Sequence, residues 1–223
     1  MNRVIKVFLA SLLFIFSTYE IYSFSVGAGS INIGPQVSLN YSQLTHDYSD
    51  GDKPSQEYSF SWGAGVNGQL NIRNFSFDLG LLYAQRVSKF SSSQKSIDLE
   101  YTFNQIEIPL VANYEISLLE STSLRMGFGA AYWLGLGDVI RDNSSLGSLS
   151  TGGKADSKSY DFLGIKNHQF VGIANLGLKL DLKVVGILVF DFRYHHPLTN
   201  RADAPNLKTI QNRSFDLSAS YLF

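Results

Sequence analysis

Apolar and polar residues alternate along most of the chain after its first thirty positions, which is the period of a β-strand with one apolar and one polar face. Around Tyr58, Phe60 and Trp62, for example, the residues between the aromatic side chains are serines. The pattern predicts eight strands, at residues 31–42, 58–72, 75–86, 97–114, 124–135, 170–182, 188–195 and 214–223. A further hairpin within residues 138–167 would raise the number to ten.

One predicted strand changes the phase of its alternation. Its apolar positions are odd-numbered up to Phe103 and even-numbered from Ile106 onward. A shift of one residue moves every side chain to the other face of a sheet. We therefore expect a β-bulge near Asn104 and Gln105, which would keep both apolar sets, Phe103 included, on the outside.

The connections between the predicted strands alternate in length. Three are short, including a tight turn at Arg73 and Asn74, and three are long and polar, at residues 43–57, 138–167 and 197–209. An even number of strands with short turns on one side and long loops on the other is typical of bacterial outer-membrane barrels, whose short turns and termini lie in the periplasm. The sequence thus predicts an all-β fold, an eight-stranded antiparallel transmembrane up-and-down β-barrel.

The two faces of the strands support this interpretation. Charged residues on the polar face must look into the lumen and neutralise one another if the apolar face touches lipid. These candidate lumen residues are Asp78, Arg86, Glu107, Arg125, Lys179, Asp181, Asp191, Arg193 and Asp216. Aromatic residues near the segment ends would form the two interfacial girdles, at Tyr41, Tyr58, Phe75, Tyr101, Tyr114, Tyr132, Tyr194, Tyr221 and Phe223. A secreted soluble β-sandwich or lipocalin-like barrel is the competing fold, although segments of about 10 to 15 residues exceed the usual 5 or 6 of soluble sheets.

The N-terminal region and the composition place the protein outside the cytoplasm. Arg3 and Lys6 precede a largely apolar run and the small residue Ser25, which predicts a signal peptide over residues 1–25 and a barrel domain over 26–223. The chain has no cysteine and a formal charge of −1, which excludes thiolate chemistry and argues against nucleic-acid binding. We expect a monomer in contact with outer-membrane lipid.

Two stretches and the end of the chain resemble known sequences. FSFDLGLLYAQ, at residues 75–85, and QIEIPLVANY, at residues 105–114, resemble the outer-membrane β-barrel family common in Bacteroidetes, often described as porin-like or PorT-like. The resemblance implies a location and a fold rather than an activity. Tyr221 and Phe223 at the end of the chain resemble the signal that the barrel-assembly machinery reads.

Candidate chemistry is sparse. His195, beside Asp191 and Arg193, is a candidate general base for a membrane-barrel lipid hydrolase, and Asp47, Asp50 and Asp52 are candidate weak calcium ligands. Otherwise the acidic residues are spread one or two per strand, so we predict no metal site, no cofactor and no enzyme. An eight-stranded barrel is just wide enough to be filled by side chains. We therefore expect a plugged lumen and a role in envelope structure or in binding an extracellular ligand through the long loops, with a small-solute channel as the alternative.

Overall fold

The computed structural model is built from strands. It describes residues 24–26, 29–48, 55–92, 97–142, 166–200 and 207–223. Within these ranges the elements are β1 (Phe24–Val26), β2 (Gly29–Tyr48), β3 (Ser55–Ile72), β4 (Phe75–Ser92), β5 (Ile97–Leu119), β6 (Thr122–Asp142), β7 (His168–Asp181), β8 (Ile187–Pro197) and β9 (Leu207–Leu222). No helix in this part of the chain has the length and apolar character needed to cross a membrane.

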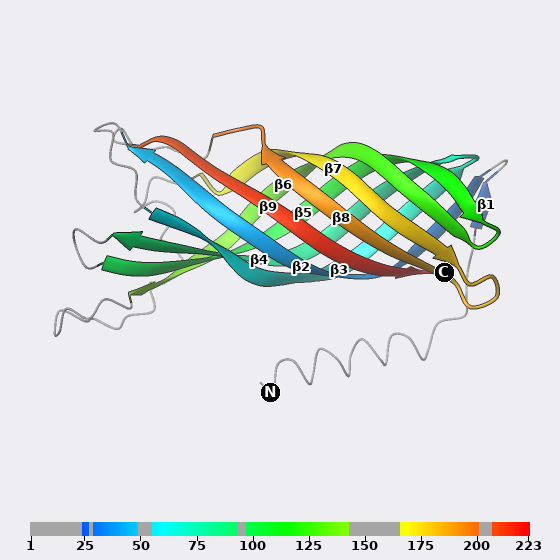
Figure 1. The fold of residues 1–223 in the computed structure, drawn as a ribbon, viewed down its shortest axis with the longest axis horizontal. Helices are drawn as coiled ribbons and strands as arrows, with labels where there is room; N and C mark the ends of the chain where they lie inside the picture. The colour runs from blue at the N-terminus through cyan, green and yellow to red at the C-terminus, as the bar shows by residue number, and fades with distance from the viewer. Residues whose placement is uncertain (1–23, 27–28, 49–54, 93–96, 143–165, 201–206) are drawn as a thin grey trace.

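The long strands close into a barrel (Figure 1). Each of β2 to β8 pairs antiparallel with the next strand, and β9 returns to pair with β2, from Gln36↔Ser220 to Tyr48↔Leu207. These eight strands confirm the predicted up-and-down barrel. The short β1 pairs with the beginning of β2 and lies at the same end as the C-terminus. It straddles the predicted cleavage site after Ser25, and cleavage there would leave Val26 alone of its three residues.

The strands are longer than the alternation predicted. β5 has 23 residues and β6 has 21. β2 runs to Tyr48 and β3 starts at Ser55, so much of the predicted loop 43–57 belongs to the barrel wall. The reason is that backbone hydrogen bonds between neighbouring strands can continue with any side chains. The alternation of apolar residues, by contrast, marks only the part of each strand that faces lipid. A hairpin at residues 143–165 would lie outside the described residues.

The outer surface is apolar, the reverse of a soluble protein. Phe60, Phe128 and Leu39 are 77%, 78% and 61% exposed. Large exposed apolar surfaces are rare on soluble monomers, and a lipid-facing band is where a membrane barrel carries them. Near the short turns, the rings of Phe75 and Tyr114 lie 5.3 Å apart, and toward the other end Tyr41 stacks on Tyr58 at 4.8 Å, as expected for two aromatic girdles. Tyr101 has its side chain outside the described part.

The bulge is where we expected it, but its effect differs. The register of β5 on β6 shifts between Asn104 and Gln105, and the extra residue is Leu136 of β6. The pairing of β4 with β5 passes this point without a shift, and Arg86 stands opposite Phe103. Phe103 therefore points into the lumen and is 1% exposed. The prediction that it faces outward was wrong because the partner strand, not its own, absorbs the change of register.

Candidate functional site

The inward side chains form a polar interior. Because side chains alternate along a strand, every second residue of the wall points inward, and most of these positions carry Asn, Gln, Ser or a charged group. The charged residues inside the described barrel are Asp78, Arg86, Glu107, Glu115, Arg125, Lys179, Asp191, Arg193 and Asp216. Apart from Asp181, all the predicted lumen residues are therefore found there, and Glu115 is added to them.

The first group, which we call the Arg86 cluster, joins β4, β5 and β9. Arg86 is fully buried and donates from Nε and Nη2 to Glu107 Oε1, at 3.0 and 2.7 Å. Its Nη1 and Nη2 donate to the two carboxylate oxygens of Asp216, at 2.7 and 2.9 Å. Gln105 Nε2 also donates to Glu107 Oε1, and the guanidinium lies 4.8 Å from the ring centre of Trp133. One cation thus binds two carboxylates across the lumen.

His195 lies beside this cluster. Its ring is 5.5 Å from that of Trp133, and its Nδ1 is 3.6 Å from Asp216 Oδ2. The side chain is buried, and neither ring nitrogen has a hydrogen-bond partner. Asp191, named beside His195 in the candidate site drawn from the sequence, is bound to Arg193 and Arg125 instead.

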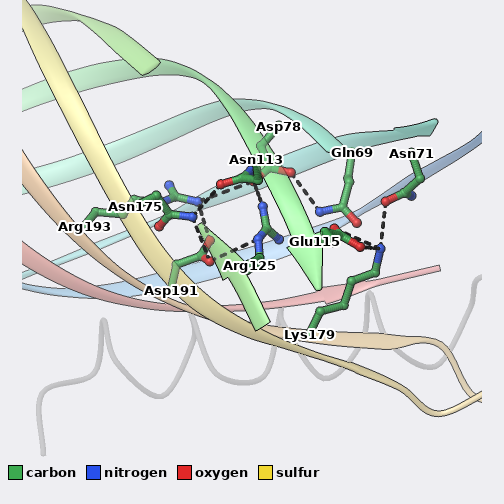
Figure 2. A network of polar contacts seen from close by, with 10 residues as sticks. All are labelled: Gln69, Asn71, Asp78, Asn113, Glu115, Arg125, Asn175, Lys179, Asp191 and Arg193. Atoms are coloured by element: carbon green, nitrogen blue, oxygen red, sulfur yellow. Dashed lines mark hydrogen bonds and ion pairs between the residues drawn. The ribbon is translucent and has the colours of Figure 1, made fainter. Parts of the chain in front are cut away.

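The second group, the Arg125 cluster, alternates cations and carboxylates between β4, β6 and β8 (Figure 2). Arg125 forms an ion pair with Asp78, and its Nε lies 3.4 Å from Asp191 Oδ1. Arg193 Nη2 lies 2.8 Å from Asp191 Oδ2 and 4.0 Å from Asp78 Oδ2. Each charge is therefore next to charges of the opposite sign, as a buried ionic network requires.

Amide side chains complete the Arg125 cluster. Gln69 and Asn113 donate to Asp78, at 2.8 and 3.1 Å. Asn175 Nδ2 is shared between Asn113 Oδ1 and Asp191 Oδ1, at 2.8 and 3.2 Å (Figure 2). Our sequence prediction named only charged residues. Gln69, Asn113 and Asn175 occupy inward-facing positions of the alternating pattern, and this is the signal that could have predicted them as lumen residues.

A glycine makes room for the same cluster. Gly177 of β7 stands opposite Asp191 of β8. A Cβ atom at Gly177 would overlap Asp191 Oδ1 and lie 3.1 Å from Arg125 Cγ. The absence of a side chain at this inward position is therefore a steric condition for the ion pair between Arg125 and Asp191.

The third group, the Lys179 cluster, lies nearest the short turns. Lys179 Nζ contacts both carboxylate oxygens of Glu115, at 3.0 and 3.2 Å, and donates to Asn71 Oδ1 at 2.7 Å (Figure 2). Asn71 in turn donates to the Ser30 hydroxyl at 3.3 Å. The Lys179 and Glu115 side chains are each 12% exposed, so this pair is more accessible than the other two clusters.

Asp181 does not belong to the lumen. It is exposed at the end of β7, and its Oδ1 accepts a hydrogen bond of 2.7 Å from the backbone N–H of Lys183. Lys183 has a φ of 57°, in the left-handed region that tight turns use. Asp181 thus stabilises the turn between β7 and β8. The assignment of Asp181 to the lumen was wrong because β7 ends at this residue, whereas the alternation in the sequence continues beyond it.

A small cavity lies among the buried charges. It is lined by Gln36, Ser38, Leu82, Glu107, Pro109, Arg193, His195, Asp216 and Ser218. Its volume is about 10 Å³, the order needed for one water molecule. The arrangement can therefore hold a species of the size of a water or an ion at this place.

Comparison with known proteins finds one family model and several solved structures that are similar to this chain. Residues 21–203 match the family model described as outer membrane protein beta-barrel domain. Neisserial surface protein A (NspA) is 13% identical over 88% of this chain and 98% of its own, with a TM-score of 0.47. OprG from Pseudomonas aeruginosa is 11% identical over 88% and 96%, with a TM-score of 0.43. Ail of Yersinia pestis, in complex with the heparin analogue sucrose octasulfate, is 15% identical over 86% and 99%, with a TM-score of 0.41.

The comparison with curated proteins finds no match. The family model, by contrast, covers most of the chain. The closed barrel with an apolar outer surface agrees with that family in fold and in environment. The chain therefore belongs to the family of outer membrane protein beta-barrel domains, and its location is the outer membrane.

Proposed function

We propose that the barrel is closed to solutes and that the protein acts through the end of the barrel that lies opposite the short turns. This end consists of the far parts of the strands and the connections between them. The observation that carries the proposal is the pair of buried ionic clusters. The Arg86 cluster joins β4, β5 and β9, and the Arg125 cluster joins β4, β6 and β8. Arg86 and Arg125 are both fully buried, so side chains rather than open space occupy these levels of the lumen.

The free energy needed to break the buried ion pairs supports a closed lumen. A barrel of eight strands encloses a space just large enough for side chains. Passage of a solute would require breaking buried ion pairs, and breaking one such pair by removing a partner costs about 3–5 kcal/mol. The Arg86 cluster alone contains two ion pairs, to Glu107 and to Asp216.

The length of the strands supports a role outside the membrane. A tilted strand needs only about 9–11 residues to cross a bilayer, whereas β5 has 23 and β6 has 21. With the short turns in the periplasm, as is usual for such barrels, the surplus projects from the cell. We infer that this projection, with the connections it carries, binds an extracellular ligand. The proposal includes no catalytic role, since His195 is enclosed within the lumen.

Liposome swelling in sugars of graded size tests the closed lumen. Liposomes with the folded wild-type protein should swell no faster than protein-free liposomes, while a wide porin serves as the positive control. The variant Arg86→Ala, shown to be folded by its heat-dependent mobility on a gel, should admit more solute than the wild type. Rapid uptake of small sugars by the wild type would support a channel instead.

Complementation tests the extracellular role. A strain lacking the protein would receive either the full chain or a chain without residues 143–165. We expect only the full chain to restore surface adhesion, while both restore resistance to detergent. If the shortened chain restores adhesion as well, ligand binding does not depend on these residues and an envelope-structural role takes its place.

The remaining expectations concern processing and family. We infer a signal peptide removed after Ser25, a monomeric state, and assembly through the barrel machinery with Tyr221 and Phe223 as its signal. The motifs at residues 75–85 and 105–114 support the narrower porin-like or PorT-like grouping common in Bacteroidetes. N-terminal sequencing of the membrane-extracted protein should start at Val26, and light scattering in detergent should give the mass of one chain. An intact N-terminus or a dimer mass would contradict these inferences.

A further inference from the structure

We propose that Glu107, His195 and Asp216 bind one divalent transition-metal ion, such as Zn²⁺, inside the barrel. The three residues come from β5, β8 and β9, and each offers one ligand atom within 4.8 Å of the other two. In the sequence the acidic residues are spread over separate strands, which argued against a metal site. Closure of the barrel brings these three side chains together.

The environment of His195 is the observation that points to a bound ligand. Its side chain is at least nine-tenths buried, at 3% residue exposure, and both ring nitrogens lack a hydrogen-bond partner. It also borders the small cavity that Glu107 and Asp216 line. A buried polar group without a partner costs free energy. A metal ion bound to one ring nitrogen would satisfy the imidazole, which is the most common metal ligand in proteins.

The charge around the cavity favours a cation. Arg86 supplies one positive charge to the two carboxylates of Glu107 and Asp216, so the Arg86 cluster keeps one net negative charge when His195 is neutral. Arg193 also borders the cavity, but its charge is offset by Asp191, which lies 2.8 Å away. The described lumen as a whole repeats this imbalance, with four cations (Arg86, Arg125, Lys179, Arg193) against five carboxylates (Asp78, Glu107, Glu115, Asp191, Asp216). A bound cation supplies the missing positive charge.

Arg86 leaves room on the carboxylates for a metal. The hydrogen bonds that Arg86 and Gln105 donate to Glu107 all end on Oε1. A carboxylate has about four lone-pair positions, so both Glu107 and Asp216 keep acceptor capacity. Arg86 and Gln105 then act as outer-shell partners that fix the orientation of the metal-binding carboxylate.

The dimensions suit a small ion with mixed nitrogen and oxygen ligands. The ligand atoms lie within 4.8 Å of one another, so an ion at their centre would be at most about 2.8 Å from each, and shifts below about 1 Å per side chain would bring it to the usual zinc distances of about 2.0–2.2 Å. The adjoining cavity of about 10 Å³ can hold a water molecule as the fourth ligand. A nitrogen ligand beside carboxylates favours Zn²⁺ and similar metals over Ca²⁺.

Metal titration of the full chain, folded in detergent and freed of metal with EDTA, tests the site. We expect one equivalent of Zn²⁺ to bind in competition with a chromophoric chelator. His195→Gln should weaken this binding at least about tenfold, in line with loss of a direct ligand. The matched control is His196→Gln, because this neighbour on β8 is exposed and points to the opposite face. Its binding should equal that of the wild type.

Two results would overturn the proposal. One is the absence of stoichiometric binding by the wild type. The other is equal binding by His195→Gln. If that variant fails to fold, as judged by its gel mobility, X-ray absorption of the zinc-loaded wild type decides the question. One imidazole among oxygen ligands is expected, and a shell of oxygen alone contradicts the site.

Discussion

Arg86 and Asp216 are 130 residues apart in the chain and meet inside the barrel through two hydrogen bonds, of 2.7 and 2.9 Å. Their strands, β4 and β9, are not neighbours in the wall, since β9 pairs with β2 and β8. The pair therefore connects, through the lumen, two strands that β2 and β3 separate in the wall. Such a charge-assisted, two-pronged contact is among the stronger polar interactions in proteins.

Removing Arg86 should destabilise the barrel strongly. In Arg86→Met the carboxylates of Glu107 and Asp216 would stay buried without their cation, and we expect the free energy of unfolding to fall by about 3–5 kcal/mol. Urea titration followed by gel mobility measures this change. Arg213→Met is the control, because Arg213 lies on the outer surface of β9, and it should change stability by less than about 1 kcal/mol. Equal losses in both variants would contradict a structural role for the ion pairs.

Neutralising the whole Arg86 cluster should restore much of that loss. The triple variant Arg86→Met, Glu107→Gln, Asp216→Asn has no buried charge left at this position. Replacing both partners of a buried pair is often nearly neutral, whereas removing one leaves an unsatisfied charge. We expect the triple variant to unfold at a higher urea concentration than Arg86→Met. A further loss of stability would show that geometry, not charge balance, dominates here.

Adding one methyl group at Gly177 should disturb the Arg125 cluster. The new Cβ atom would overlap Asp191 Oδ1 and the backbone oxygen of Phe190, and overpacking of this kind costs about 1–3 kcal/mol. Gly172→Ala is the matched control on the same strand, because the nearest atom to its Cβ would be 3.5 Å away, an ordinary contact. Unfolding by urea should separate the two variants. Similar stabilities would mean that β7 and Asp191 move apart without cost.

The Lys179 cluster allows a charge swap. Lys179→Glu places two carboxylates together at a partly exposed position, and we expect a loss of about 1 kcal/mol, which added salt should reduce. The double variant Lys179→Glu, Glu115→Lys restores opposite charges and should recover most of the stability. Urea titration at low and high salt compares the variants. A double variant no more stable than Lys179→Glu would show that the contact of Lys179 with Asn71 matters more than the ion pair.

The fold was predictable because polarity records which face of each strand touches lipid. The alternation around Trp62 and Asp78 indicates both that a strand is present and which way each side chain points. The number of strands and the inward direction of Arg86 could therefore be predicted from the sequence. Asp181 shows the limit of the method. Polar residues at a strand end alternate no differently from those in the following turn. Glu115 was missed because the predicted strand was ended at Tyr114, although the alternation continues at Ile116 and Leu118.

The partners of the lumen charges could not be predicted in the same way. Whether Arg86 meets Asp216 or Asp191 depends on the register with which β9 closes onto β2, from Gln36↔Ser220 onward. That register is a property of the whole cylinder and not of any one strand. The grouping of His195 with Glu107 and Asp216 has the same origin, and so no local motif announces it.

The two tryptophans of the chain face opposite sides of the wall and report on which side meets lipid. Trp62 is 42% exposed on the outer surface and Trp133 is 1% exposed in the lumen. In liposomes of brominated lipid, Trp133→Phe, which keeps Trp62, should lose most of its fluorescence, because bromine quenches a tryptophan that it can touch. Trp62→Phe, which keeps Trp133, should lose little. Stronger quenching of Trp133 than of Trp62 would mean that the apolar face is not the lipid-facing one, and the membrane orientation of every strand would have to be reversed.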